Sequence, residues 1–125
     1  MAGRSSGRGN ADTIRENFSP ESREVVAIPT SVGLVLAGPT SDGQCYIIKS
    51  FSRIINTSGS DRTVTFYMVP TGDSAADANS IGKALSLPAN TWVPFGEKYL
   101  GYGFDLYAVA SSTGVQVSWD LLTED

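Results

Sequence analysis

The sequence contains no histidine and a single cysteine, Cys45, and both features exclude classes of chemistry. Without histidine, Ser-His-Asp and Cys-His catalysis are excluded, and so are zinc or iron sites that are held by imidazole. No side chain has an ordinary pKa near neutrality. A lone cysteine cannot form a disulfide within the chain, and its apolar neighbours predict a small buried side chain rather than a nucleophile.

Charged residues are also scarce, at 18% of the chain, and the formal net charge is −4. Proteins that bind nucleic acid usually present a basic face, so we expect no direct nucleic-acid binding. Residues 1–24 hold four arginines and four acids, which places the whole net charge on residues 25–125. The centres of protein interfaces are depleted of charge, so this composition favours a surface that meets another surface.

Long apolar runs are missing as well. The longest, residues 32–37, is far too short to span a bilayer, and we expect no membrane partner. Residues 1–18 contain no apolar stretch of the kind that a secretory signal peptide needs, so we expect no such signal.

Residues 1–24 differ in composition from the rest of the chain. The first ten are rich in glycine, serine and arginine and cannot bury enough surface to offset their ordering entropy. Ile14 and Phe18 are four apart and could share one helical turn before a proline ends it. Two interpretations remain open: a disordered tail, or an extended arm that orders on a partner. In the second, the candidate partner contacts are Arg4, Arg8, Ile14 and Phe18.

From residue 25 onward, short alternating segments are separated by Gly, Pro, Asp and Asn turns. Such a pattern is typical of an all-β protein, here an antiparallel β-sandwich, for which a jelly roll is one topology. We therefore predict one β-sandwich domain over residues 25–125, with an extended N-terminal arm over residues 1–24. About eight strands are expected: residues 24–29, 31–38, 45–55, 62–70, 81–87, 91–95, 104–110 and 115–121.

Several faces can be assigned from alternation. Residues 62–70 form the cleanest strand, which should direct Val64, Phe66 and Met68 into the core. Residues 45–55 carry apolar side chains on both alternating faces, and we predict a β-bulge near residues 50–53 that exchanges the faces. The last strand should bury one side and leave residues 123–125 as a solvated tail. Other residues expected to share a face or point inward are Val32, Leu34 and Leu36, then Leu85 and Leu87, then Val115, Val117, Trp119 and Leu121.

Aspartates are the only candidates for acid–base or metal chemistry. Asp73 and Asp77 lie four apart in a loop of small residues, and Asp42 and Asp61 lie in turns. Paired carboxylates can hold calcium or act as acid and base. The spacing of an EF-hand is absent, however, and aspartate is common in turns because it bonds its own backbone. We interpret all four as solvated turn residues and expect no metal, no cofactor and no enzymatic activity.

Aromatic residues are concentrated between residues 92 and 107. Three interpretations are open: packing within the sheets, an oligomer interface, or stacking against sugar rings. The residues that would form such an oligomer or ligand face are Trp92, Tyr99, Tyr102 and Tyr107.

Specific residue runs mark the strands and turns between residues 49 and 96. In order, they are KSF at 49–51, NTSG at 56–59, the alternating TVTFYMVP at 63–70, a loop from Gly72 to ADANSI at 76–81, and LPAN at 87–90. This succession resembles a family of small bacteriophage virion proteins, and the glycine turn and final hairpin of residues 101–119 are similar too. The resemblance covers roughly residues 25–122, and its motifs are turns and strands.

The resemblance implies a β-sandwich on a virus particle and supplies no catalytic residues. We expect a capsid decoration (cement) protein that stabilises the assembled shell by added buried area, through self-association and the N-terminal arm. A homotrimer is the favoured oligomer. The expected partners are the major capsid protein or other virion proteins, and the expected location is the virion, assembled in the host cytoplasm. The alternatives are a head or tail fibre, a neck component, or a carbohydrate-binding β-sandwich module.

Overall fold

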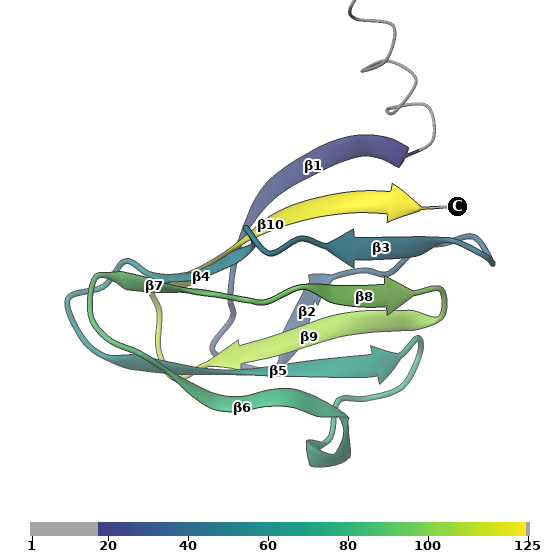
Figure 1. Cartoon of the computed structure of the whole chain (residues 1–125). Helices are drawn as coiled ribbons and strands as arrows, with labels where there is room; N and C mark the ends of the chain where they lie inside the picture. Colours follow the sequence, from purple (N-terminus) through teal and green to yellow (C-terminus); the bar gives the residue numbers. More distant parts are fainter. Residues whose placement is uncertain (1–17, 125) are drawn as a thin grey trace, which may run out of the picture.

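A computed structural model describes residues 18–124, with side chains from Val25 onward. Within this range the chain forms two antiparallel sheets packed as two layers, so the all-β sandwich is confirmed (Figure 1). Sheet A has six strands and sheet B has four. The elements are β1 (Phe18–Ala27), β2 (Gly33–Leu36), β3 (Cys45–Ile48), β4 (Arg53–Asn56), β5 (Arg62–Pro70), the 3-10 helix η2 (Asp77–Asn79), β6 (Ser80–Leu87), β7 (Thr91–Pro94), β8 (Lys98–Gly101), β9 (Phe104–Ala110) and β10 (Val115–Glu124).

β10 is the strand of sheet A with the most partners, because it pairs with β1 on one edge and with β3 and β4 on the other. β1 follows one edge along its whole length, from Phe18 opposite Glu124 to Ala27 opposite Gln116. On the other edge, β4 pairs with the first part of β10 and β3 with the second. β7 and β8 then pair with β4 and β3, respectively. Sheet A is therefore four rows of strands wide (Figure 1).

Sheet B has the order β2-β9-β5-β6, and its inner face closes the core against sheet A. In β5, Val64 and Phe66 are buried and Met68 packs against the same core, as predicted. The predicted inner face of β10 is also confirmed, because all four of its residues are buried. The core between the layers contains Ile28, Val35, Leu36, Ile48, Ile54, Val64, Phe66, Leu87, Phe95, Leu100, Leu106, Ala108, Ala110, Val115, Val117, Trp119 and Leu121.

Trp119 stands at the centre of this core and joins the two sheets. Its buried indole packs edge-on against Phe66 of β5 and against Phe95, with ring centroids 6.5 and 5.0 Å away. Its Nε1 donates a hydrogen bond of 3.2 Å to the carbonyl oxygen of Val35 in β2. Val35 lies where the register of β2 against β9 shifts, and it has no register partner in β9. The bulge therefore leaves a carbonyl for the indole to bind.

Residues 45–55 form two strands, β3 and β4, with a short break between them. The break is fastened to β10 at Asp120, whose carbonyl oxygen accepts a 2.8 Å hydrogen bond from the Lys49 N–H. The buried Ser52 hydroxyl accepts a 2.9 Å bond from the Asp120 N–H. The Ser52 carbonyl oxygen accepts a bond from the N–H of Phe95. At the break, the Ser52 hydroxyl thus supplies the hydrogen-bond acceptor that a backbone carbonyl of a neighbouring strand would otherwise offer to β10.

The predicted exchange of faces in this segment is wrong. Ile48 and Arg53 are five positions apart but stand opposite Leu121 and Ser118, which are three apart. The break therefore inserts two residues, and an even insertion preserves the period of two. Ile48, Ser52 and Ile54 are all buried, while Phe51 and Arg53 are exposed. The apolar residues of the other face stay on the outside of sheet A.

Local irregularities explain two other differences from the expected faces. Leu34 is exposed while Val35 and Leu36 are buried, because the bulge in β2 shifts the alternation. Leu85 lies at the surface although Leu87 is buried. The irregular part of β6 lies directly before Leu85, where Ala84 has a φ of 50° and the register against β5 shifts between Gly82 and Leu85.

Two strand boundaries also differ from expectation. β8 was not expected, because glycines flank it, and the division of residues 45–55 adds a further strand to give ten. Thr123 and Glu124 belong to β10 and pair with β3, so they are not a free tail. β1 begins at Phe18 and crosses the expected boundary between arm and domain. The arm itself and the jelly-roll topology stay predictions, and residues 1–17 lie outside the described residues.

Asn56, at the end of β4, connects two loops from inside the protein. Its buried Nδ2 donates to the carbonyl oxygens of Ser60, Leu87 and Pro88 at 2.8, 3.0 and 3.2 Å. Its Oδ1 accepts bonds from the backbone N–H and the hydroxyl of Ser58 at 2.9 and 2.7 Å. The NTSG and LPAN runs of the sequence therefore form one hydrogen-bonded unit in the fold.

Replacing Asn56 with alanine should lower the free energy of unfolding by about 2–4 kcal/mol, because buried carbonyl groups lose their donor. The matched control is Thr57→Ala. The exposed Thr57 hydroxyl makes one bond, to the Gly114 carbonyl oxygen, so we expect a loss of about 1 kcal/mol or less. Urea unfolding of both variants measures the difference. Equal losses in the two variants would contradict the role given to Asn56.

Candidate functional site

The most distinctive surface is the side of sheet A that faces away from sheet B. Strand registers define it, because residues directly opposite each other project to the same side. One row crosses the sheet from Gln116 through Ile55 to Trp92, and another from Leu122 through Ile47 to Tyr99. We call this surface the outer face of sheet A. Its described members are Val25, Ala27, Cys45, Ile47, Phe51, Arg53, Ile55, Trp92, Pro94, Tyr99, Gln116, Ser118, Asp120, Leu122 and Glu124.

Large apolar side chains on this face are open to solvent. Phe51, Tyr99 and Val25 are 64%, 62% and 60% exposed, and Trp92 is 53% exposed. Single exposed apolar residues are ordinary in soluble proteins, but several on one sheet face form a patch. Patches of this kind mark protein interfaces or ligand grooves more often than plain surface.

The Arg53 guanidinium lies over the Trp92 ring on this face. Its guanidinium carbon lies 4.5 Å from the centre of the indole ring, which is a cation–π contact. Next to it, a shallow groove of about 260 Å³ is lined by Phe51, Arg53, Ile55 and Ser118. Exposed aromatic rings and arginines beside a groove are the features that anchor side chains at protein interfaces.

One charged side chain on this face is buried. Asp120 is 2% exposed, and in the register of β1 against β10 it stands opposite Arg23. It lies beside the break between β3 and β4, where its backbone bonds Lys49 and Ser52. Asp120 therefore has a structural position within sheet A and is not part of the solvent-exposed patch.

Cys45 lies at one end of the outer face and is half-buried rather than fully buried as predicted. Burial raises the pKa of its thiol, the negative charge of Glu124 raises it further, and a backbone hydrogen bond from Leu100 acts in the opposite direction. Glu124 is the residue directly opposite Cys45 in the strand register. The thiol is therefore poorly ionised near neutral pH and is not an activated nucleophile.

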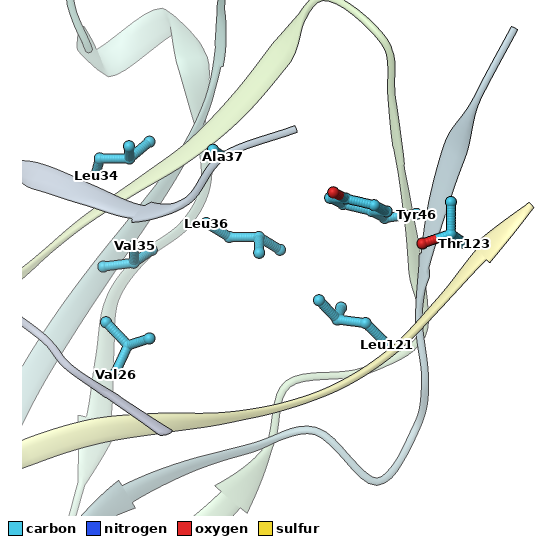
Figure 2. Close-up of a pocket in the computed structure, with 8 residues that line it drawn as sticks. All are labelled: Val26, Leu34, Val35, Leu36, Ala37, Tyr46, Leu121 and Thr123. Carbon is cyan, nitrogen blue, oxygen red and sulfur yellow. The ribbon is translucent and has the colours of Figure 1, made fainter. Parts of the chain in front are cut away.

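A second hollow lies between the two sheets, beside β1 and β2 (Figure 2). It has a volume of about 400 Å³, and Tyr46 reaches across it from β3 with its hydroxyl toward β2. Among its described lining residues, the hydroxyls of Tyr46 and Thr123 are the polar side-chain groups. The described walls offer apolar contact without an ionised group. They are Val26, Leu34, Val35, Leu36, Ala37, Tyr46, Leu121 and Thr123.

The structure brings only part of the expected aromatic face together. Trp92 and Tyr99 share the outer face of sheet A, on rows that β10 separates by about 20 Å at 3.4 Å per residue. Tyr102 lies in the turn between β8 and β9. Tyr107 belongs to sheet B, opposite Tyr67 and Leu34. The four residues therefore do not form one continuous site.

The expected partner contacts of the N-terminal segment lie mostly beyond the structure. Arg4, Arg8 and Ile14 are outside the described residues, and Phe18 is the first residue of β1. Sequence reasoning missed Phe51 and Val25 as surface residues. The available signal for Phe51 was the second apolar face of residues 45–55, which was interpreted as an irregular strand.

The turn aspartates are exposed and have structural roles where contacts are present. The Asp61 carboxylate accepts a bond from the Ala89 N–H, and Asp77 forms a 3.5 Å ion pair with Lys83. Among the side chains that the structure describes, those of residues 25–124, no group of three or more Cys, Asp or Glu is placed to hold a metal ion.

Comparison with protein-family models, curated proteins and solved structures found no match to this chain. In the described part of the chain, no helix has the length and apolar character to cross a membrane.

The effect of Glu124 on the Cys45 thiol can be tested by alkylation with iodoacetamide. Glu124→Gln should speed the reaction at pH 8, because removing the nearby negative charge lowers the thiol pKa and increases the thiolate fraction. Glu97→Gln is the control, since Glu97 precedes β8 at the end away from Gly101, the partner of Cys45. Equal rates in wild type and Glu124→Gln would contradict the electrostatic contribution.

Proposed function

We propose that this protein is a structural component of a bacteriophage virion, a decoration (cement) protein that stabilises the assembled shell. The observation that carries the proposal is the outer face of sheet A, where Val25, Phe51, Trp92 and Tyr99 are exposed on a rigid sheet. The succession of turn and strand motifs that resembles small virion proteins supports it. In this role the protein acts by adhesion, and bound copies stabilise the shell by mass action.

The rest of the structure fits a protein that is rigid rather than adaptable. Trp119 and Asn56 each fasten elements distant in sequence, by bonds to Val35 and to Leu87 and Pro88. A preorganised surface loses little conformational entropy when it binds, so more of its contact energy is available for adhesion. We propose a homotrimer as the unit that binds, with the major capsid protein as the main partner.

The N-terminal segment supplies the contact with neighbouring capsid subunits in this proposal. β1 pairs with β10 from Phe18 onward, and in this proposal residues 1–17 make the contact with a neighbouring subunit. At about 3.4 Å per residue, a fully extended segment of this length reaches about 55–60 Å. Burial of Ile14 on a capsid subunit would contribute about 2 kcal/mol before ordering entropy is subtracted. Arg4 and Arg8 are further candidate contacts there.

Deletion of residues 1–17 should weaken binding to undecorated particles at least tenfold, because the apolar and charged contacts of the segment are lost. Co-sedimentation of the purified protein with particles measures the affinity. The truncation leaves β1 intact, and an unchanged unfolding midpoint confirms that the domain is folded. Unchanged particle affinity of the truncated protein would remove the arm from the mechanism.

Mass spectrometry of intact particles distinguishes decoration from the other virion roles. A copy number comparable to that of the major capsid protein fits decoration of the shell. A small fixed number would instead indicate a fibre, neck or tail component, and absence from particles would overturn a virion role.

A carbohydrate-binding module is the second candidate, because Trp92 and Tyr99 expose their rings on one face. Aromatic faces of this kind can stack against sugars. If this alternative is correct, a glycan array will show binding by the wild type that Trp92→Ala abolishes. Our primary proposal predicts no specific glycan binding, and a glycan signal that depends on Trp92 would favour the alternative.

A further inference from the structure

We infer that the outer face of sheet A is the surface through which copies of this chain associate with one another. The inference rests on the proposed function, which requires self-association, and it names the surface and the partner. The occupant is a second copy of this chain. Size, charge and shape of the face each support this assignment.

The face has the size that a stable interface between copies requires. β10 is ten residues long, so at about 3.4 Å per residue it extends about 34 Å. Four rows of strands at about 4.8 Å give a width of about 19 Å, and hence a projected area of about 650 Å². Side-chain relief increases the accessible area above this projection. A standard interface buries about 800 Å² on each partner.

Its charge is low enough for burial against a like surface. Among the described members, the residues of charged type are Arg53, Asp120 and Glu124. The Arg53 guanidinium is stacked on Trp92, Asp120 is already buried, and Glu124 lies at the edge of the face. Two copies of a strongly charged face would repel each other, whereas a central apolar patch with a charged margin matches the composition of protein interfaces.

The face also presents complementary shapes to a copy of itself. Phe51 projects from the break between β3 and β4 with 64% of its surface exposed. The groove of about 260 Å³ beside it is lined by Phe51, Arg53, Ile55 and Ser118. A projecting ring and a groove on one surface allow Phe51 of each copy to enter the groove of the next copy around a threefold axis, as the proposed homotrimer requires.

Other apolar surfaces fit a second copy less well. The exposed large apolar residues of sheet B are scattered over three strands, with Leu34 on β2, Phe104 on β9, and Ile81 and Leu85 on β6. The β6 edge is irregular at Ala84 and bears the Lys83–Asp77 ion pair, which hinders pairing with another chain. The hollow between the sheets opens at the side of the sandwich and has no projecting counterpart among its described walls.

Sedimentation equilibrium of the purified full-length protein tests the inference. The wild type should sediment above its 13.2 kDa monomer mass, and Tyr99→Glu and Phe51→Glu should each weaken association at least tenfold. The matched control is Tyr102→Glu, because Tyr102 is 49% exposed but lies in the β8–β9 turn. It should leave association unchanged. All three sites are exposed, and unchanged unfolding midpoints will show that each variant is folded.

Alkylation of Cys45 gives an independent readout on the same face. Association should cover the thiol, so its alkylation should slow as protein concentration rises, and Tyr99→Glu should abolish this dependence. A monomeric wild type, or association that both face variants retain, would overturn the inference. If Tyr102→Glu alone lost association, the contact between copies would lie near the β8–β9 turn and not on the outer face of sheet A.

Particle binding separates this inference from the proposed function. Association through the face without any binding to virions would uphold the inference and refute the virion role. Binding to virions by a wild type that is monomeric in solution and on the particle would uphold the virion role and refute the inference. Glycan binding by a monomeric wild type through Trp92 would replace the second copy with a carbohydrate and overturn the inference.

Discussion

The fold depends on the position of the Trp119 indole between the sheets. Its ring fills the centre of the core against Phe66 and Phe95, and its N–H needs an acceptor there because a buried donor without one is costly. The Val35 carbonyl oxygen supplies that acceptor from the opposite sheet. One side chain of β10 therefore fixes both the spacing of the layers and the place of the β2 bulge.

The outer face follows from the same constraint. With Trp119 and Val117 held inward, Ser118 and the other alternate residues of β10 must point away from sheet B. The registers of β10 with its three neighbouring strands, and of β3 and β4 with β8 and β7, then bring their alternate residues to the same side. Exposure of Trp92 and Tyr99 is thus imposed by the packing of the core and does not result from loose loops. A surface fixed in this way is preorganised for contact.

Sequence alone could predict the strands whose two faces differ clearly in polarity. β5, β9 and β10 alternate cleanly, so their predicted bounds were close to the observed ones except at the end of β10, and the predicted buried sides of β5 and β10 were confirmed. Residues 45–55 were not interpretable in this way, because both faces are apolar and alternation gives no sign of which is inside. The separation of Tyr107 from Trp92 depends on which sheet each strand joins, and that pairing of distant segments is not encoded in local periodicity.

The motif runs and the surface carry different information. Asn56 binds the carbonyl oxygens of Leu87 and Pro88, so the NTSG and LPAN runs are required to close two loops onto each other. A protein that shares these runs needs the same loop geometry, whatever its outer face contains. The motifs behind the resemblance therefore bear on the fold and do not themselves indicate a function. The case for adhesion rests on Phe51, Trp92 and Tyr99, which the loop geometry does not require and which the sheet nevertheless exposes to solvent.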